Sequence, residues 1–194
     1  MTRRQTNFDL ELLTKVGGRY ELMPHSREGV DLREATFSEC GRYRYSLTRI
    51  WGDGKTLLFV MLNPSTADGL QDDPTIRRCI GYARRSGYTG IAVGNLYALR
   101  ATNPAMLLAH DEASRRGPEN FFSLAGLAKF AQLGNSPVIC AWGAFPETLG
   151  RTDLAVMDLF KKIGVKTLCF GKTKNGSPRH PLYLSNNVAS EPYD

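Results

Sequence analysis

The sequence predicts an α/β fold of three layers, α/β/α, in which helices cover both faces of a central, mostly parallel sheet. Segments of apolar strand residues alternate with segments of helical periodicity from about residue 55 to residue 170. Such alternation is typical of parallel sheets with crossover helices. The first of these strands, residues 55–62, is uniformly apolar after its start, which indicates a strand buried on both faces.

The expected elements follow in a regular order. Residues 42–51 alternate basic with aromatic or apolar side chains, and the turn Gly-Asp-Gly at 52–54 leads into residues 55–62, which predicts a hairpin. A helix is expected over residues 74–86, with Asp73 as N-cap, Pro74 at the first position and Gly87 after its end. Further strands are expected at 91–96, 138–142 and 166–170, and further helices from about 118 to 130 and at 154–163.

Length and composition fit one domain. A chain of 194 residues buries roughly 70% of the surface that its unfolded form exposes, so it needs no disulfide or metal to hold a core. We expect residues 1–34 to form an N-terminal hairpin or arm packed on the domain, and residues 35–194 to form a single α/β domain. The 25 Lys and Arg against 19 Asp and Glu, a formal charge of +6, favour a polyanionic partner such as nucleic acid.

Membrane and metal chemistry have little support in the sequence. The longest apolar run covers residues 57–62, whereas about 20 residues are needed to span a bilayer, and the start of the chain has no apolar signal core. We therefore expect a cytoplasmic monomer without membrane contact. The four cysteines form no Cys-x-x-Cys pair, so we expect buried thiols, no metal and no cofactor. They are Cys40, Cys79, Cys140 and Cys169.

The first candidate site follows the strand at 55–62. Ligands of parallel sheets bind outside the carboxyl ends of the strands, and the loop Asn-Pro-Ser-Thr-Ala-Asp at 63–68 lies at such an end. Its amide and hydroxyl groups can position a water, or the loop can be only a turn before the next helix. Asp68, Asp72 and Asp73 can bind a divalent metal together, although Asp73 is better explained as the helix cap.

Two later loops contribute further candidates. Asn95, at the end of the strand 91–96, can present a donor and an acceptor to a base edge, or it can hold neighbouring backbone. Residues 171–185 combine Lys172, Lys174 and Arg179 with His180 and three apolar residues, which suits phosphate contacts, although the alternative is a solvated basic loop anchored by its leucines. Arg77, Arg78, Arg84 and Arg85 form a cationic helix face that binds DNA or is simply solvated.

Taken in order, these loops resemble the motifs of the uracil-DNA glycosylase superfamily. Residues 60–65, Val-Met-Leu-Asn-Pro-Ser, resemble its first motif in the form of the mismatch-specific uracil and thymine glycosylase branch. Residues 93–96 resemble the strand that ends in a base-reading Asn, and residues 139–144 resemble the following strand and its small-residue turn. Residues 179–185, Arg-His-Pro-Leu-Tyr-Leu-Ser, resemble the His-Pro-Ser-x-Leu motif near the superfamily's C-terminus.

The resemblance implies a uracil-DNA-glycosylase-like fold and a set of roles. Asn63 would hold the attacking water, His180 would donate to the base oxygen, and Asp68 or Asp73 would supply the carboxylate that an Asn lacks. Pro64, Ser65, Asn95 and Asp73 would surround the base. Residues expected on the DNA are Arg77, Arg78, Arg100, Lys172, Lys174 and Arg179, with Leu182, Tyr183 and Leu184 as the wedge that enters the base stack.

These roles predict a monofunctional DNA N-glycosylase acting on double-stranded DNA. Ser65 stands where the efficient uracil-specific branch has a Tyr that excludes groups on the pyrimidine 5-position. A flipped, 5-substituted pyrimidine is therefore the expected substrate, with a place in phage defence or in the modification or repair of phage DNA. The alternatives are an N-glycosidase or hydrolase acting on free nucleotides, a non-catalytic module that binds DNA or modified bases, and a metal-dependent nuclease.

A second resemblance is closer and implies no activity. The stretch from Tyr43 to Pro104, especially Leu-Asn-Pro-Ser-Thr-Ala-Asp at 62–68 and Asp-Pro-Thr at 73–75, is similar to domain of unknown function family 1643, an uncharacterised bacterial and phage family.

Overall fold

The computed structural model describes residues 18–22, 32–144 and 147–194. The strands are β1 (Gly18–Leu22), β2 (Leu32–Ser38), β3 (Arg44–Ile50), β4 (Thr56–Met61), β5 (Gly90–Asn95), β6 (Val138–Cys140), β7 (Thr167–Cys169) and β8 (Glu191–Pro192). The helices are α2 (Pro74–Arg85), α3 (Glu112–Arg116), α4 (Asn120–Leu133) and α5 (Thr152–Ile163), with short 3-10 helices η1 (Pro104–Ala109), η2 (Glu147–Leu149) and η3 (Pro181–Tyr183).

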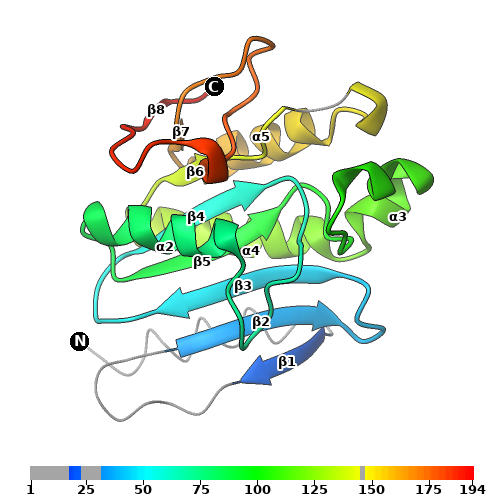
Figure 1. The fold of residues 1–194 in the computed structure, drawn as a ribbon, viewed down its shortest axis with the longest axis horizontal. Helices are drawn as coiled ribbons and strands as arrows, with labels where there is room; N and C mark the ends of the chain where they lie inside the picture. The colour runs from blue at the N-terminus through cyan, green and yellow to red at the C-terminus, as the bar shows by residue number, and fades with distance from the viewer. Residues whose placement is uncertain (1–17, 23–31, 145–146) are drawn as a thin grey trace.

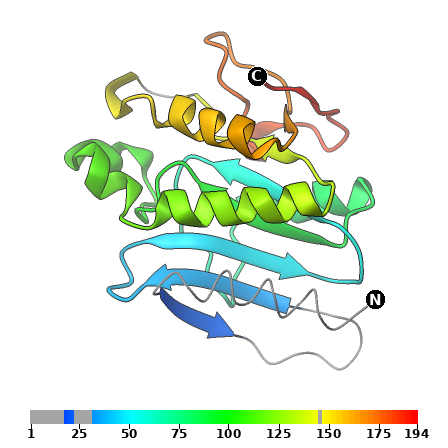
Figure 2. The same cartoon turned by 180° about the vertical axis from the view of Figure 1, so that it is seen from behind.

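One mixed sheet forms the centre of the molecule, and its strands lie in the order β1-β2-β3-β5-β4-β6-β7-β8 (Figure 1). Helix α2 covers one face, and α4 and α5 cover the other (Figures 1 and 2). Strand β4 is buried on both sides: Phe59 belongs to the apolar cluster beneath α2, whereas Val60 belongs to the cluster beneath α4 and α5. The predicted α/β class and the doubly buried strand are confirmed.

The prediction of a mostly parallel sheet is wrong. Among the described residues, four strand pairs are antiparallel and three are parallel. The parallel pairs join β5, β4, β6 and β7, the strands that alternate with helices in the sequence. The antiparallel pairs come from β1, β2 and β3 on one side and from β8 on the other. Strands β1, β2 and β3 follow one another without a crossover helix and pair antiparallel, and β3 also pairs antiparallel with β5, which follows α2 in the sequence.

The predicted hairpin between residues 42–51 and 55–62 is also wrong, because β5 lies between β3 and β4. Thr89, just before β5, bonds to both ends of the predicted turn. The Trp51 N–H donates to the carbonyl of Thr89, and the Thr89 N–H donates to the carbonyl of Lys55. A Cβ atom on Gly54 would lie 2.8 Å from Oγ1 of Thr89. The glycine therefore makes room for β5, and the hairpin partner of β3 is β2.

Most of the other predicted elements are confirmed. Helix α2 begins at Pro74, and the Asp73 side chain accepts from the Ile76 N–H at 2.8 Å, as expected for an N-cap. Helices α4 and α5 and strands β5, β6 and β7 lie in the expected regions. Cys79, Cys140 and Cys169 are buried, but the prediction fails for Cys40, which is exposed in the turn between β2 and β3.

The predicted N-terminal arm overlaps the sheet. Strand β1 and the first residues of β2 fall within residues 1–34, and β1 pairs antiparallel with residues 34–38 of β2. Residues 1–17 and 23–31 of the predicted arm lie outside the described residues. No helix in the described part of the chain is long and apolar enough to cross a membrane.

Asp72 is the centre of a buried charge cluster, which generates a stability prediction. It accepts from Arg49 Nε at 2.8 Å and from Arg33 Nη2 at 2.5 Å, and the Arg49 side chain is only 3% exposed. We expect Asp72→Ala to lower the free energy of unfolding by about 3–5 kcal/mol, since it leaves a buried guanidinium without its counter-charge. Urea unfolding measures this change.

The matched control is Asp158→Ala, which removes the exposed pair with Lys162 on α5. An exposed pair of this kind contributes about 0.5 kcal/mol or less. If Asp72→Ala destabilises the protein no more than Asp158→Ala does, the Asp72 cluster contributes no more to the free energy of unfolding than an exposed ion pair.

Candidate functional site

A pocket of about 480 Å³ opens at the carboxyl ends of β4 and β6. Its walls come from the loop after β4, the start of α2, the loop after β5, the turn after β6 and the segment around η3. The polar and aromatic side chains that line it are Arg44, Asn63, Ser65, Thr66, Asp73, Thr75, Thr102, Trp142, His180 and Tyr183.

The chain topology explains why the pocket is at this place. From β4 the chain passes through α2 on one face to β5, whereas from β6 it passes through α5 on the other face to β7. The loops that leave the adjacent strands β4 and β6 therefore diverge toward opposite faces. A crevice at such a switch point is the usual ligand site of α/β sheets, and the sequence placed its candidates at these strand ends.

Asn63 is fixed in one orientation by the backbone around it. Its side-chain nitrogen Nδ2 donates to the carbonyl of Pro64 at 3.0 Å and to the carbonyl of Ala101 at 2.8 Å. Both amide hydrogens are used, so the side chain offers the pocket only its carbonyl oxygen. Asn63 can thus accept a hydrogen bond from a water, but it has no hydrogen left to donate to a base. Pro64 is buried and helps to join these two loops.

His180 lies across the pocket from the β4 loop and has a defined tautomer. Its Nδ1 accepts from the backbone N–H of Leu182 at 3.3 Å, which leaves Nε2 to carry the hydrogen of the neutral ring. A Cβ atom on Gly143, at φ +79°, would lie 3.3 Å from the His180 Cβ, so the turn after β6 is close to the base of this side chain. Burial lowers the pKa of His180, while the Asp73 charge opposes this shift.

Asp73 is the carboxylate of this pocket. Its Oδ1 caps α2, and among the described residues its Oδ2 has no hydrogen-bond partner. The Asp73 charge acts on the pKa values of both His180 and Arg44, raising each against the opposite effect of burial. Of the two carboxylates that the sequence offered for activating a water, the structure brings this one to Asn63.

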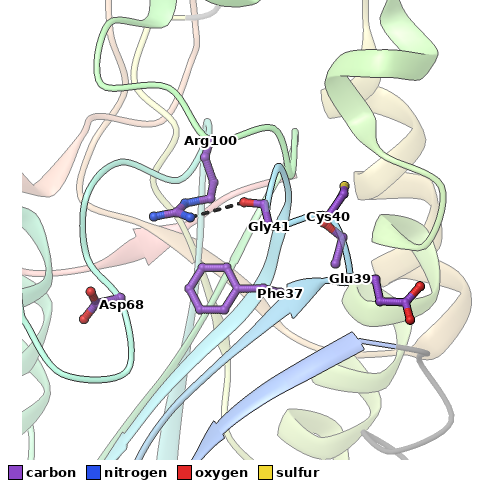
Figure 3. Close-up of a pocket in the computed structure, with 7 residues that line it drawn as sticks. Phe37, Glu39, Cys40, Gly41, Asp68 and Arg100 are labelled. Atoms are coloured by element: carbon purple, nitrogen blue, oxygen red, sulfur yellow. Dashed lines mark hydrogen bonds between the residues drawn. The ribbon is translucent and has the colours of Figure 1, made fainter.

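Asp68 lies in a different pocket, of about 260 Å³, between the β2–β3 turn and Arg100 (Figure 3). Its Oδ1 accepts from the N–H groups of Leu70 and Gln71, both at 2.7 Å. Burial alone would raise the pKa of Asp68, but these hydrogen bonds, with the charges of Arg49 and Arg100, lower it below its usual value. Asp68 therefore organises its own loop and does not reach the water position at Asn63.

Asn95 does not reach the pocket either. It ends β5 fully buried, and within the described part of the chain neither polar atom of its side chain has a hydrogen-bond partner. The backbone carbonyl of Asn95 accepts from the Asn120 side chain at 2.9 Å, and this hydrogen bond joins β5 to the start of α4. In this arrangement the predicted base-reading residue is part of the interior.

Arg44 is the pocket residue that sequence reasoning missed. It is 2% exposed, its Nη1 donates to the carbonyl of Ala67 at 2.5 Å, and its Nε has no partner. The register between β2 and β3 leaves Tyr45 as an extra residue, since Phe37 pairs with Arg44 and Thr36 pairs with Ser46. A bulge of this kind reverses the alternation of side chains along the strand, so the Arg44 side chain turns inward. The bulge is visible only in the pairing of β2 with β3.

Several of the basic side chains that were expected to contact DNA instead contact groups of the protein itself. Arg78 donates to the carbonyl of Leu184 and to the Asn186 side chain, which fastens the C-terminal segment to α2. Arg77 donates to the carbonyl of Asp72. Arg84 lies over Trp51, Arg100 over Phe37 and Lys172 over Tyr193, each within about 6 Å of the ring centre. Lys174 and Arg179 are exposed on the segment after β7.

The three predicted wedge residues differ in position. Leu182 and Tyr183 line the pocket, and Tyr183 is 80% exposed. Leu184 is 6% exposed and belongs to the apolar cluster beneath α2. Leu184 therefore anchors the loop, and only its two neighbours remain available to a ligand. Among the described residues no group of three or more His, Cys, Asp or Glu is placed to hold a metal ion.

The residues from Arg44 to Leu182 match the family described as "Protein of unknown function (DUF1643)". The chain belongs to this family. The matched segment contains almost all of the residues that line the pocket. No curated protein and no solved structure matches the chain.

The lowered pKa of His180 predicts a pH dependence of stability. The unfolded chain, with a His pKa of about 6.5, takes up the proton more readily than the folded state does. The His180 contribution is therefore fully present above that pH and is lost as the pH falls below it. We expect His180→Gln to lose less stability than the native protein between pH 7 and pH 5 in urea unfolding.

An NMR titration of the ring protons checks the same point directly. The His180 midpoint is expected below 6.5, because burial lowers the pKa of this ring. A His180 midpoint at or above 6.5 contradicts the burial argument.

Proposed function

We propose that the protein is a DNA glycosylase that hydrolyses the N-glycosidic bond of a flipped, 5-substituted pyrimidine. One observation carries this proposal: Asn63 and Asp73, from the connection between β4 and α2, and His180, from the segment before η3, line a single pocket at the carboxyl ends of the parallel strands. The resemblance of four motifs to the uracil-DNA glycosylase superfamily supports it. We include in it a three-layer, uracil-DNA-glycosylase-like arrangement, which the helices on both faces support.

The chemistry requires three functions, and the pocket offers a group for each. A water held by the Asn63 carbonyl oxygen attacks C1′ of the sugar, and the Asp73 carboxylate accepts the proton that it loses. The bond between C1′ and the base nitrogen breaks, and its electron pair leaves with the base. Nε2–H of His180 donates to the base oxygen as negative charge develops there. A donor of this kind is worth about 3–4 kcal/mol, and a placed base about 10²–10⁴ in rate.

The proposed substrate preference follows from the side chains at the mouth and on the wall of the pocket. Ser65 lines the pocket with a small side chain, which leaves space for a group on the pyrimidine 5-position. Tyr183, exposed at the rim, and Leu182 are placed to fill the gap that a flipped nucleotide leaves in a duplex. Lys174 and Arg179 supply exposed positive charge beyond β7 for phosphate contacts.

A second candidate function is hydrolysis of the same bond in free nucleotides, and Arg44 favours it. A buried cation inside the pocket suits a ligand that carries its own anionic group inward. Several surface cations expected on DNA also have partners within the protein. Salt dependence separates the candidates, since duplex binding weakens by about 0.9 log units per phosphate contact per log unit of salt.

The catalytic carboxylate is tested by Asp73→Asn. Asn is as good an N-cap as Asp, so the variant keeps α2 while removing the charge, and we expect turnover to fall about 10²–10⁴-fold. Strand cleavage at abasic sites, brought about by alkali after the reaction, measures turnover, and binding to the same duplex measures affinity.

Asp68→Asn is the matched control, because Asp68 lies in the same loop region but faces the other pocket. It is expected to keep turnover within about threefold of the native rate. Loss of turnover in Asp68→Asn with retention in Asp73→Asn would contradict the assignment, and binding without turnover in the native protein would indicate a non-catalytic module.

Substrate preference is tested by a panel of duplexes with uracil, 5-hydroxymethylpyrimidines and their sugar adducts. The native protein is expected to cleave the 5-substituted bases better than uracil, and Ser65→Tyr is expected to reverse that order, because the larger ring fills the space. Ser65→Ala, which stays small, is the control. Efficient cleavage of uracil alone by the native protein would refute the proposed preference.

A further inference from the structure

We propose that Arg44 and the first turn of α2 form an anion subsite inside the pocket, which takes the phosphate ester of a pyrimidine nucleotide. This inference rests on the proposed function and deepens it, because it makes the bound unit a nucleotide with its phosphate rather than a nucleoside or a free base. Nothing in the glycosylase resemblance assigns Arg44 a part.

Arg44 is a buried cation whose hydrogen-bond donors are only partly used by the described residues. Among the described residues, one of its guanidinium nitrogens has a hydrogen-bond partner, Nη1 on the Ala67 carbonyl, and the buried Nε has none. Among the ion pairs between described residues, none includes Arg44. A buried guanidinium of this kind is costly unless an anion completes its hydrogen bonds.

The surroundings of Arg44 favour a phosphate. Pro74, Thr75 and Ile76 line the pocket, so the amino end of the twelve-residue helix α2 faces it. The N-cap carboxylate of Asp73 accepts from the Ile76 N–H, and Pro74 has no N–H, so this helix end adds the backbone N–H of Thr75 to the donors of Arg44. Hydroxyl groups of Ser65, Thr66, Thr75 and Thr102 line the same pocket and offer donors to phosphate oxygens.

Arg44 attracts an anion through its own unused hydrogen-bond donors, not through an excess of positive charge in the pocket. Asp73 is the acidic residue among the pocket-lining residues, and its charge offsets that of Arg44. Arg44 remains charged near neutral pH, since burial lowers its pKa only to about 10. A planar guanidinium binds phosphate through two parallel hydrogen bonds, which lysine does not reproduce.

Binding measurements test the subsite without requiring turnover. Calorimetry compares deoxythymidine monophosphate with thymidine, and we expect the native protein to bind the monophosphate at least about tenfold more tightly. Arg44→Met is expected to remove this difference, and Arg44→Lys to reduce it. Arg116→Met, which alters an arginine of α3 that does not line the pocket, is the control and is expected to keep it.

Equal binding of nucleotide and nucleoside by the native protein overturns the inference, whether or not the variants fold. Retention of the difference by folded Arg44→Met overturns it as well, and indicates that Arg44 only supports the Ala67 loop. Thermal unfolding of each variant establishes that it is folded.

The phosphate can belong to a free nucleotide or to the backbone beside a flipped nucleotide in DNA. Displacement of the monophosphate by a single-stranded or double-stranded oligonucleotide, weakened in Arg44→Met, supports the backbone phosphate. Oligonucleotide binding that is unaffected by Arg44→Met supports the free nucleotide. Base release is measured separately, so phosphate-dependent binding without base release rejects the glycosylase proposal and leaves the subsite intact.

Discussion

The position of β4 is the constraint on which the rest of the structure depends. This strand is buried on both faces and lies between β5 and β6. The chain leaves it toward the α2 face, and it leaves the adjacent β6 toward the α5 face. The pocket lies where these paths diverge, and the same arrangement places β5 between β3 and β4. Right-handed crossovers on opposite faces require the strand order to reverse at this point.

Asp73 joins the fold to the chemistry of the site. It caps α2, and its charge acts on the buried Arg44 and on His180 from opposite sides of the pocket. A cation, a carboxylate and a neutral imidazole thus share a region of limited solvent access, where their charges interact more strongly than at the surface. The residue that caps α2 therefore also raises the pKa values of the cation and the imidazole in the pocket against the effect of burial.

The distribution of positive charge differs from what the net charge suggests. Arg78 fastens the C-terminal segment to α2, Arg49 holds Asp72, and Arg44 lies within the pocket. A basic composition therefore reflects internal contacts as well as any polyanionic partner. Exposed cations remain on the segment after β7, next to Leu182 and Tyr183 at the mouth of the pocket.

The sequence by itself determined the central elements and the strand ends that carry the site. Helical and strand periodicity, the cap at Asp73 and the loops holding Asn63 and His180 are local features, and local propensity and patterning encode them. The tertiary structure decided which strands pair and which side chains meet. The insertion of β5, the bulge that turns Arg44 inward, the burial of Asn95 and the separation of Asp68 from Asn63 all depend on contacts between distant segments. Those contacts have no periodic signal along the chain, because the register of a strand is set by its neighbour in the sheet.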